Sequence, residues 1–174
     1  AISALFLARG WRYDQEHPDL IIINTCTVTA TADKKARELI RRLRREYPQS
    51  LIAICGCYAQ RDAAAIAALP GVNIIAGVDE RRSLPELVAE YAAADRAAAS
   101  GPLIAVASIS GQKRFQRIAA ESDQNRARAY LKIEDGCDQD CAYCIIPQVR
   151  GPVRSLPLAQ AVEQARQLIA AGHS

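Results

Sequence analysis

The chain has 174 residues, half of them hydrophobic, and a formal net charge of +3. This length and composition are sufficient for one well-packed domain, or for one domain and part of another, and they exclude a disordered tail. The small net charge excludes a protein that is basic overall, so any surface for nucleic acid must arise from local clustering.

The residues present show no pattern for export or membrane insertion. No apolar run approaches the roughly 20 residues that span a bilayer, and no basic flank, apolar core and small-residue cleavage site follow one another. Six cysteines without such a signal are typical of a reducing compartment, where thiols stay available for metals. We therefore expect a cytoplasmic, monomeric protein without a membrane partner.

Hydrophobic patterning predicts alternating strands and helices over the first hundred residues. Continuously apolar runs at 20–23 and 51–54 indicate strands that are covered on both faces, as in a parallel sheet, and 72–77 indicates a third short strand. Helices are predicted over 31–47, 62–69 and 84–94, and an earlier helix ends at Gly10. The repeating order predicts an α/β fold with a doubly wound parallel sheet.

The helix predicted over 31–47 has one apolar and one basic face, with Thr31 or Asp33 as its N-terminal cap. Its basic residues between 34 and 45 are opposed by a single acid, Glu38. They are Lys34, Lys35, Arg37, Arg41, Arg42, Arg44 and Arg45. Such a face suits a phosphate backbone, but most charge runs of this kind are solvated helix faces. Both interpretations stay open.

Cysteines follow two of the predicted strands. Cys26 lies just beyond the first strand, and Cys57 just beyond the second. Because right-handed crossovers place equivalent ends of neighbouring parallel strands side by side, these two cysteines could share one metal. A pair of buried structural thiols is an equally good interpretation, and we assign Cys55, inside the strand, to that class.

The remainder of the chain resembles the start of a barrel. An apolar run at 103–109 has no assigned partner, and polar residues at 111–125 indicate a connection between domains. A strand predicted over 127–133 leads into a cysteine-rich loop, and a helix predicted over 157–171 follows. One strand-loop-helix unit carries its chemistry at the carboxyl end of the strand, as in a βα barrel.

The cysteine-rich loop has the spacing CxxxCxxC, formed by Cys137, Cys141 and Cys144. Three thiolates on short spacers can hold one four-iron cluster, which leaves one iron open to an exogenous ligand. A structural zinc site needs four ligands, and neither a histidine nor a fourth cysteine lies nearby. An odd number of cysteines also argues against a disulfide framework.

These residues resemble the signature of the radical S-adenosylmethionine superfamily, which places an aromatic residue, here Tyr143, before the last cysteine. The resemblance implies that the three cysteines hold a 4Fe-4S cluster whose open iron chelates S-adenosyl-L-methionine, with Tyr143 beside the cofactor. One electron from the cluster then cleaves the sulfonium and yields a 5′-deoxyadenosyl radical.

Three segments together resemble the methylthiotransferase family: Asn24-Thr25-Cys26, 56–60 and 131–151. The resemblance implies a second 4Fe-4S cluster held by Cys26, Cys57 and a third cysteine on a strand preceding Ala1. It implies an N-terminal α/β domain at 1–100, a connection at 101–125 and the truncated start of the radical domain at 126–174. An RNA-binding β-barrel would follow Ser174. We expect this chain alone, as a fragment, to be inactive.

The residues after Cys26 indicate a subgroup of this family. Thr27-Val28-Thr29 and 32–35 resemble enzymes that methylthiolate N6-threonylcarbamoyladenosine next to the anticodon of tRNA. Alternatives are isopentenyladenosine in tRNA, an aspartate of a ribosomal protein, or a non-catalytic iron-sulfur or zinc-binding module. The implied partners are tRNA and an electron donor such as flavodoxin or ferredoxin. Arg150 and Arg154 either contact RNA or pair with acids.

Overall fold

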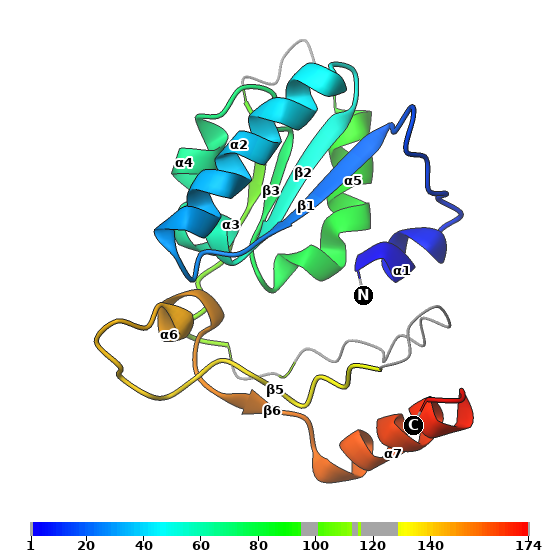
Figure 1. Cartoon of the computed structure of the whole chain (residues 1–174), viewed down its shortest axis with the longest axis vertical. Helices are drawn as coiled ribbons and strands as arrows, with labels where there is room; N and C mark the ends of the chain where they lie inside the picture. Colours follow the sequence, from blue (N-terminus) through cyan, green and yellow to red (C-terminus); the bar gives the residue numbers. More distant parts are fainter. Residues whose placement is uncertain (1, 95–100, 113–114, 116–128, 174) are drawn as a thin grey trace.

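A four-stranded parallel sheet forms the centre of the fold, in the order β1-β2-β3-β4 (Figure 1). The computed structural model describes residues 2–94, 101–112, 115 and 129–173. The strands are β1 (Leu20–Thr25), β2 (Leu51–Gly56), β3 (Ile74–Ala76) and β4 (Leu103–Ala105). The three predicted strands are confirmed, and the apolar run at 103–109 supplies the fourth.

Helices cover both faces of the sheet (Figure 1), as the doubly wound arrangement requires. On one face lie α2 (Ala30–Glu46), α3 (Cys57–Arg61) and α4 (Ala63–Ala67). On the other face lie α1 (Ile2–Leu7) and α5 (Leu84–Ala93), the latter preceded by the 3-10 helix η1 (Glu80–Ser83). Successive side chains of β2 enter the two cores in turn, which is why its sequence is apolar without interruption.

The register of the first two strands aligns their carboxyl ends. Thr25, the last residue of β1, is paired with Gly56, the last residue of β2. Cys26 and Cys57 are the next residues of each strand, so they leave the sheet at equivalent positions on the same edge. The predicted adjacency of these two strand ends is confirmed.

The N-terminal cap of α2 is Thr29, so the prediction of Thr31 or Asp33 was wrong. Thr29 has an extended backbone, and its Oγ1 accepts a hydrogen bond of 3.1 Å from the backbone N–H of Ala32. Asp33 is buried in the first turn, where its carboxylate forms an ion pair of 2.8 Å with Arg61 of α3. Asp33 therefore joins two helices instead of capping one.

Beyond the sheet, two short strands pair with each other. They are β5 (Glu134–Asp135) and β6 (Arg154–Ser155), and their pairing is antiparallel. The prediction of a strand over 127–133 was wrong for the part that the structure describes. Residues 129–133 form no strand, and pairing begins at Glu134. A strand needs a neighbour for its backbone groups, and in the described chain that neighbour is the segment returning after α6 (Ile146–Arg150).

The last helix, α7 (Leu158–Ala170), confirms the prediction over 157–171, and Gly172 follows it with a positive φ of 91°. None of the helices in the described ranges combines the length and the hydrophobicity that a bilayer-spanning helix needs. The sheet extends to β4, inside the segment 101–125 that we expect to connect two domains. Most of 111–125 lies outside the described residues, and the domain boundaries stay a prediction.

Gly56 is the residue that allows β2 to turn directly into α3. Its φ is 98°, and a Cβ there would lie 2.5 Å from the backbone oxygen of Thr25. We expect Gly56→Ala to lower the free energy of unfolding by about 2 kcal/mol or more, because strain and overlap add. Urea unfolding of the protein measures this value.

Gly111→Ala is the matched control, because a Cβ at Gly111 meets no atom within 4 Å. We expect that change to leave the unfolding midpoint within error of the unsubstituted protein. Equal midpoints for the two variants would contradict the role assigned to Gly56.

Candidate metal centre

The first group of candidate ligands lies at the carboxyl edge of the sheet. Cys57 is buried as the first residue of α3, whereas Cys26 is exposed on the segment between β1 and α2. Between Cys26 and the cap of α2, the hydroxyl of Thr27 is buried and has no hydrogen-bond partner among the described residues. An unpartnered polar atom at this position is compatible with a group bound at the edge.

The second group lies on the loop that contains the CxxxCxxC spacing. Cys137 and Cys144 are half-buried and Cys141 is exposed. The backbone N–H of Cys137 donates to Gly151 O at 3.1 Å, and that of Cys144 donates to Cys141 O at 2.9 Å. Asp138 Oδ1 accepts from the Val153 N–H at 2.8 Å. The first part of the loop is thus fastened to the segment 151–153.

Gly136 allows the close approach that begins this loop. Its φ is 83°, and a Cβ there would lie 2.1 Å from the backbone oxygen of Pro152. Tyr143, by contrast, is 93% exposed. The role of Tyr143 beside a cofactor stays a prediction.

The chemistry of both cysteine groups fits an iron-sulfur cluster, because all six cysteines are free thiols and soft sulfur ligands suit iron. Their side chains are not gathered around one point, however. Within the described residues no group of three His, Cys, Asp or Glu side chains is placed to hold a metal ion. The ligand sets predicted from the sequence therefore stay predictions.

Apolar packing brings the two cysteine groups to the same side of the molecule. Helix α6 directly follows the CxxxCxxC loop, and its residue Val149 is buried against Cys57 and Val78 together with Ile145. Val78 follows β3, so this small core joins two strand ends of the sheet to the loop segment. Figure 1 shows α6 beneath the carboxyl ends of the strands.

A buried cluster of charges reinforces this contact. Arg154 of β6 is 4% exposed, and its guanidinium lies 3.4 Å from Asp79, which follows β3. The same guanidinium lies 3.8 Å from Asp135 of β5 and donates a hydrogen bond of 2.7 Å to Arg150 O. Since a buried charge needs partners, Arg154 fixes the loop segment to the edge of the sheet.

Asp135 is the acidic centre of this cluster. Its carboxylate accepts from Arg150 Nη1 at 3.1 Å and also pairs with Lys132. Burial by itself raises the pKa of Asp135, but Lys132 and Arg150 outweigh burial and hold that pKa below its usual value. The carboxyl group is therefore ionised, and it connects the residues on both sides of the cysteine loop.

Arg150 connects the cluster to Cys57. Burial lowers the pKa of this guanidinium, but a hydrogen bond with the Cys57 thiol and the charge of Asp135 together raise it above the usual value. The sequence left open whether Arg150 and Arg154 contact RNA or pair with acids. Arg154 is buried and pairs with acids. Arg150 also pairs with an acid, Asp135, and about a third of its side chain remains exposed.

Two residues of this edge escaped the sequence analysis. Asp79 received no role, although it closely follows a predicted strand at the end where α/β sheets place polar groups. Gln60 was noticed only as part of a resembling segment. Its amide donates to Ala107 O at 2.8 Å and accepts from the Val78 N–H at 3.0 Å, so it ties α3 to the segments that follow β3 and β4.

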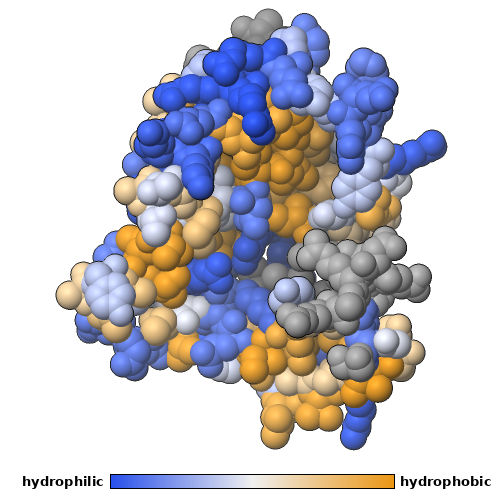
Figure 2. Space-filling model, viewed as in Figure 1, coloured by the Kyte–Doolittle hydropathy of each residue, from blue (hydrophilic) through white to orange (hydrophobic). Residues whose placement is uncertain are grey.

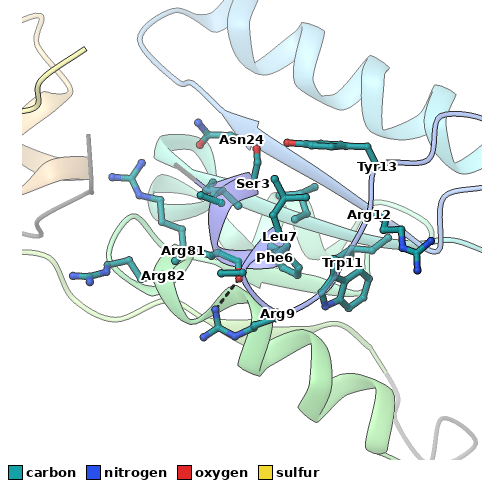
Figure 3. Close-up of a pocket in the computed structure, with 16 residues that line it drawn as sticks. Ser3, Phe6, Leu7, Arg9, Trp11, Arg12, Tyr13, Asn24, Arg81 and Arg82 are labelled. Atoms are coloured by element: carbon teal, nitrogen blue, oxygen red, sulfur yellow. Dashed lines mark hydrogen bonds between the residues drawn. The ribbon is translucent and has the colours of Figure 1, made fainter. Parts of the chain in front are cut away.

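A cavity of about 700 Å³ lies elsewhere, between α1 and the open edge of β1 (Figure 3). It is lined by apolar side chains such as Phe6 and Trp11, with Arg81 and Arg82 also at its wall. Among the residues that the structure describes, no cysteine, histidine or acidic residue lines it. The cavity is therefore not the metal centre that the sequence predicts.

Comparisons with known proteins agree with this architecture. Residues 2–77 match the "Uncharacterized protein family UPF0004". The chain is 38% identical over 175 residues to the Bacillus subtilis "Threonylcarbamoyladenosine tRNA methylthiotransferase MtaB", covering 99% of this chain and 38% of that protein. The MtaB of Aquifex aeolicus is 30% identical, over 96% of this chain and 40% of its own length.

A second kind of relative is also similar. The "tRNA-2-methylthio-N(6)-dimethylallyladenosine synthase" of Sphingopyxis alaskensis is 33% identical over 91% of this chain and 35% of its own length. The chain belongs to the methylthiotransferase family. Within that family the chain is MtaB-like, and it spans about two fifths of the length of the curated relatives it matches.

The buried cluster can be tested by removing its central cation. We expect Arg154→Met to lower the free energy of unfolding by about 3–5 kcal/mol, because Asp79 and Asp135 lose a buried partner. Thermal and urea unfolding measure the loss. Arg166→Met, on the exposed side of α7, is the control and should cost less than about 0.5 kcal/mol. Equal losses would contradict the assignment.

Proposed function

We propose that this chain forms part of a tRNA methylthiotransferase. Relatives of both kinds carry tRNA methylthiolation in their names and match nine-tenths or more of the chain. The observation that supports the proposal most directly is the packing of α6, which directly follows the CxxxCxxC loop, against the strand-end cysteine Cys57. A reaction that uses two cysteine-held clusters needs both groups on one side of the molecule.

The substrate we propose is N6-threonylcarbamoyladenosine in tRNA, which would be methylthiolated at C2. The MtaB relatives named for this nucleoside are 38% and 30% identical to the chain, and the segment after Cys26 resembles their subgroup. The 33% identity to a dimethylallyladenosine synthase keeps isopentenyladenosine as the second candidate. A ribosomal protein aspartate is the third.

The residues of this chain have separate roles in the proposal. Cys137, Cys141 and Cys144 would hold one 4Fe-4S cluster, and Cys26 and Cys57 would contribute to another. Bound there, the clusters and S-adenosyl-L-methionine would supply the electron, the radical and the methylated sulfur. Arg150, whose guanidinium pKa is raised by the nearby Cys57 thiol, would offset the negative charge of a thiolate, and Arg154 would hold the two segments together.

The substrate is tested in cells that lack the gene. We expect their tRNA to lose 2-methylthio-N6-threonylcarbamoyladenosine and to retain its unmethylthiolated precursor, as measured by mass spectrometry of nucleosides. The intact gene should restore the modification, and copies with Cys57→Ala or Cys141→Ala should not. Cys55→Ala is the matched control, because burial raises the pKa of that thiol to about 11 and makes it a core residue.

Other results would select another candidate. If methylthiolation of threonylcarbamoyladenosine is unchanged and methylthiolation of isopentenyladenosine is lost, the substrate is the second candidate. A mass change confined to a ribosomal protein would select the third. No change in tRNA or ribosomal protein would refute the proposed function.

A non-catalytic metal-binding module is the alternative from another class, and metal analysis separates it. After anaerobic reconstitution, we expect the Cys141→Ala variant to contain about four iron and four sulfide per chain fewer than the unsubstituted protein, because one cubane is lost. Iron and acid-labile sulfide assays measure the loss, with Cys55→Ala as the control. Stoichiometric zinc without sulfide would instead support the module.

A further inference from the structure

The net positive charge of the chain arises from one helix. Helix α2 holds seven of the 22 basic residues and three of the 19 acidic residues, a net charge of +4. Since the whole chain carries +3, the remaining residues carry a net charge of −1. One helix thus accounts for the entire positive excess.

Two of these seven cations have structural roles. Arg37 donates to the Tyr58 hydroxyl at 2.9 Å and lies over the same ring, which joins α2 to α3. Arg44 donates to Pro48 O at 2.9 Å and to Asn73 Oδ1 at 3.0 Å, beyond the end of the helix. Neither guanidinium is available to a partner without losing these bonds.

The other cations form the outer face of α2. Lys34 and Glu38 are 3.9 Å apart as an exposed pair one turn apart. Lys35, Arg41, Arg42 and Arg45 are exposed, and in the part of the chain that the structure describes no acid lies within ion-pair distance of them. Figure 2 shows this face as a hydrophilic surface over α2. We call these four residues the basic stripe.

We propose that the basic stripe of α2 binds the phosphate backbone of the RNA substrate. This inference rests on the proposed function, since it names a surface through which a tRNA-modifying protein would hold its tRNA. Lys35 and Arg45 lie ten residues apart, about 15 Å along the helix, which is enough for several phosphates of one strand.

The composition of this face favours RNA over a protein partner. Protein interfaces have cores rich in aromatic and apolar residues and depleted of charge, and among the described residues of α2 no large hydrophobic side chain is exposed. A membrane surface is disfavoured for a related reason. An interfacial helix inserts its apolar face, but Ala36 and Ile40 of α2 are buried in the core of the sheet.

The position of the helix also favours the substrate. Its N-terminal cap, Thr29, is three residues beyond Cys26, so α2 begins close to the sheet edge that carries Cys26 and Cys57. An RNA backbone along α2 would therefore run toward that edge. The two structural arginines hold the helix rigidly in this position, which lowers the ordering cost of binding.

The test is RNA binding by the intact protein as a function of salt. The probe is an RNA hairpin with the anticodon stem and loop of a tRNA, followed by fluorescence anisotropy. We expect the triple variant Arg41→Gln, Arg42→Gln and Arg45→Gln to bind about tenfold or more weakly at low salt. The slope of its plot of log affinity against log salt concentration should be smaller in magnitude by about 3, which is one unit for each lost phosphate contact.

Two further variants control for charge and for folding. Arg12→Gln, Arg82→Gln and Arg166→Gln remove the same charge from exposed positions outside α2 and should leave the salt slope unchanged. Arg41→Lys, Arg42→Lys and Arg45→Lys keep the charge and should restore most of the affinity. An unchanged salt slope in the α2 Gln variant would overturn the proposal. Equal losses of RNA affinity in the α2 Gln variant and in the Gln variant outside α2 would also overturn it. The proposal would also be overturned if poly-glutamate competed with the labelled hairpin as strongly as unlabelled RNA does.

Failure of this proposal differs from failure of the proposed function. If the α2 variant binds the hairpin normally while the protein methylthiolates tRNA, the surface is wrong and the function stands. If the unsubstituted protein neither binds the hairpin nor methylthiolates tRNA, both are wrong. Reduced binding by the α2 variant, with the Cys141→Ala protein binding RNA normally, supports the surface independently of catalysis.

Discussion

The arrangement of this chain depends on the buried cation of Arg154. A guanidinium removed from water must be compensated, and here the partners are Asp79 at the end of a central strand and Asp135 just before the cysteine loop. These partners come from segments more than fifty residues apart in the sequence. One charge therefore fixes the cysteine loop relative to the sheet, and the small core of Val149, Val78 and Cys57 closes the same contact.

The sheet contributes a second constraint at the same edge. Parallel pairing with Thr25 opposite Gly56 brings the ends of β1 and β2 together, and the positive φ of Gly56 starts α3 without a loop. Cys57 is consequently buried against α6 while Cys26 stays exposed. Two thiols from equivalent positions thus have different environments, because one strand continues into a helix and the other into an open segment.

Helix α2 shows how one element serves the fold and a surface together. Its apolar residues complete the core on one face of the sheet, and Arg37 and Arg44 extend this anchoring to α3 and to the turn before β3. The cations that remain outside are held on a rigid support. A charge run that is ambiguous in sequence therefore divides into structural and exposed members only when its neighbours are known.

The sequence by itself determined the α/β fold, three of the four strands of the sheet, the long helices and the CxxxCxxC spacing, because apolar periodicity and ligand spacing are local properties. It also predicted that Cys26 and Cys57 share an edge, since parallel topology leaves little choice. It misplaced the cap of α2 and the strand before the cysteine loop, and it assigned no role to Asp79. Only the tertiary structure decided these, together with the pairing of Arg154, because ion pairs, caps and strand partners depend on groups that approach from distant parts of the chain.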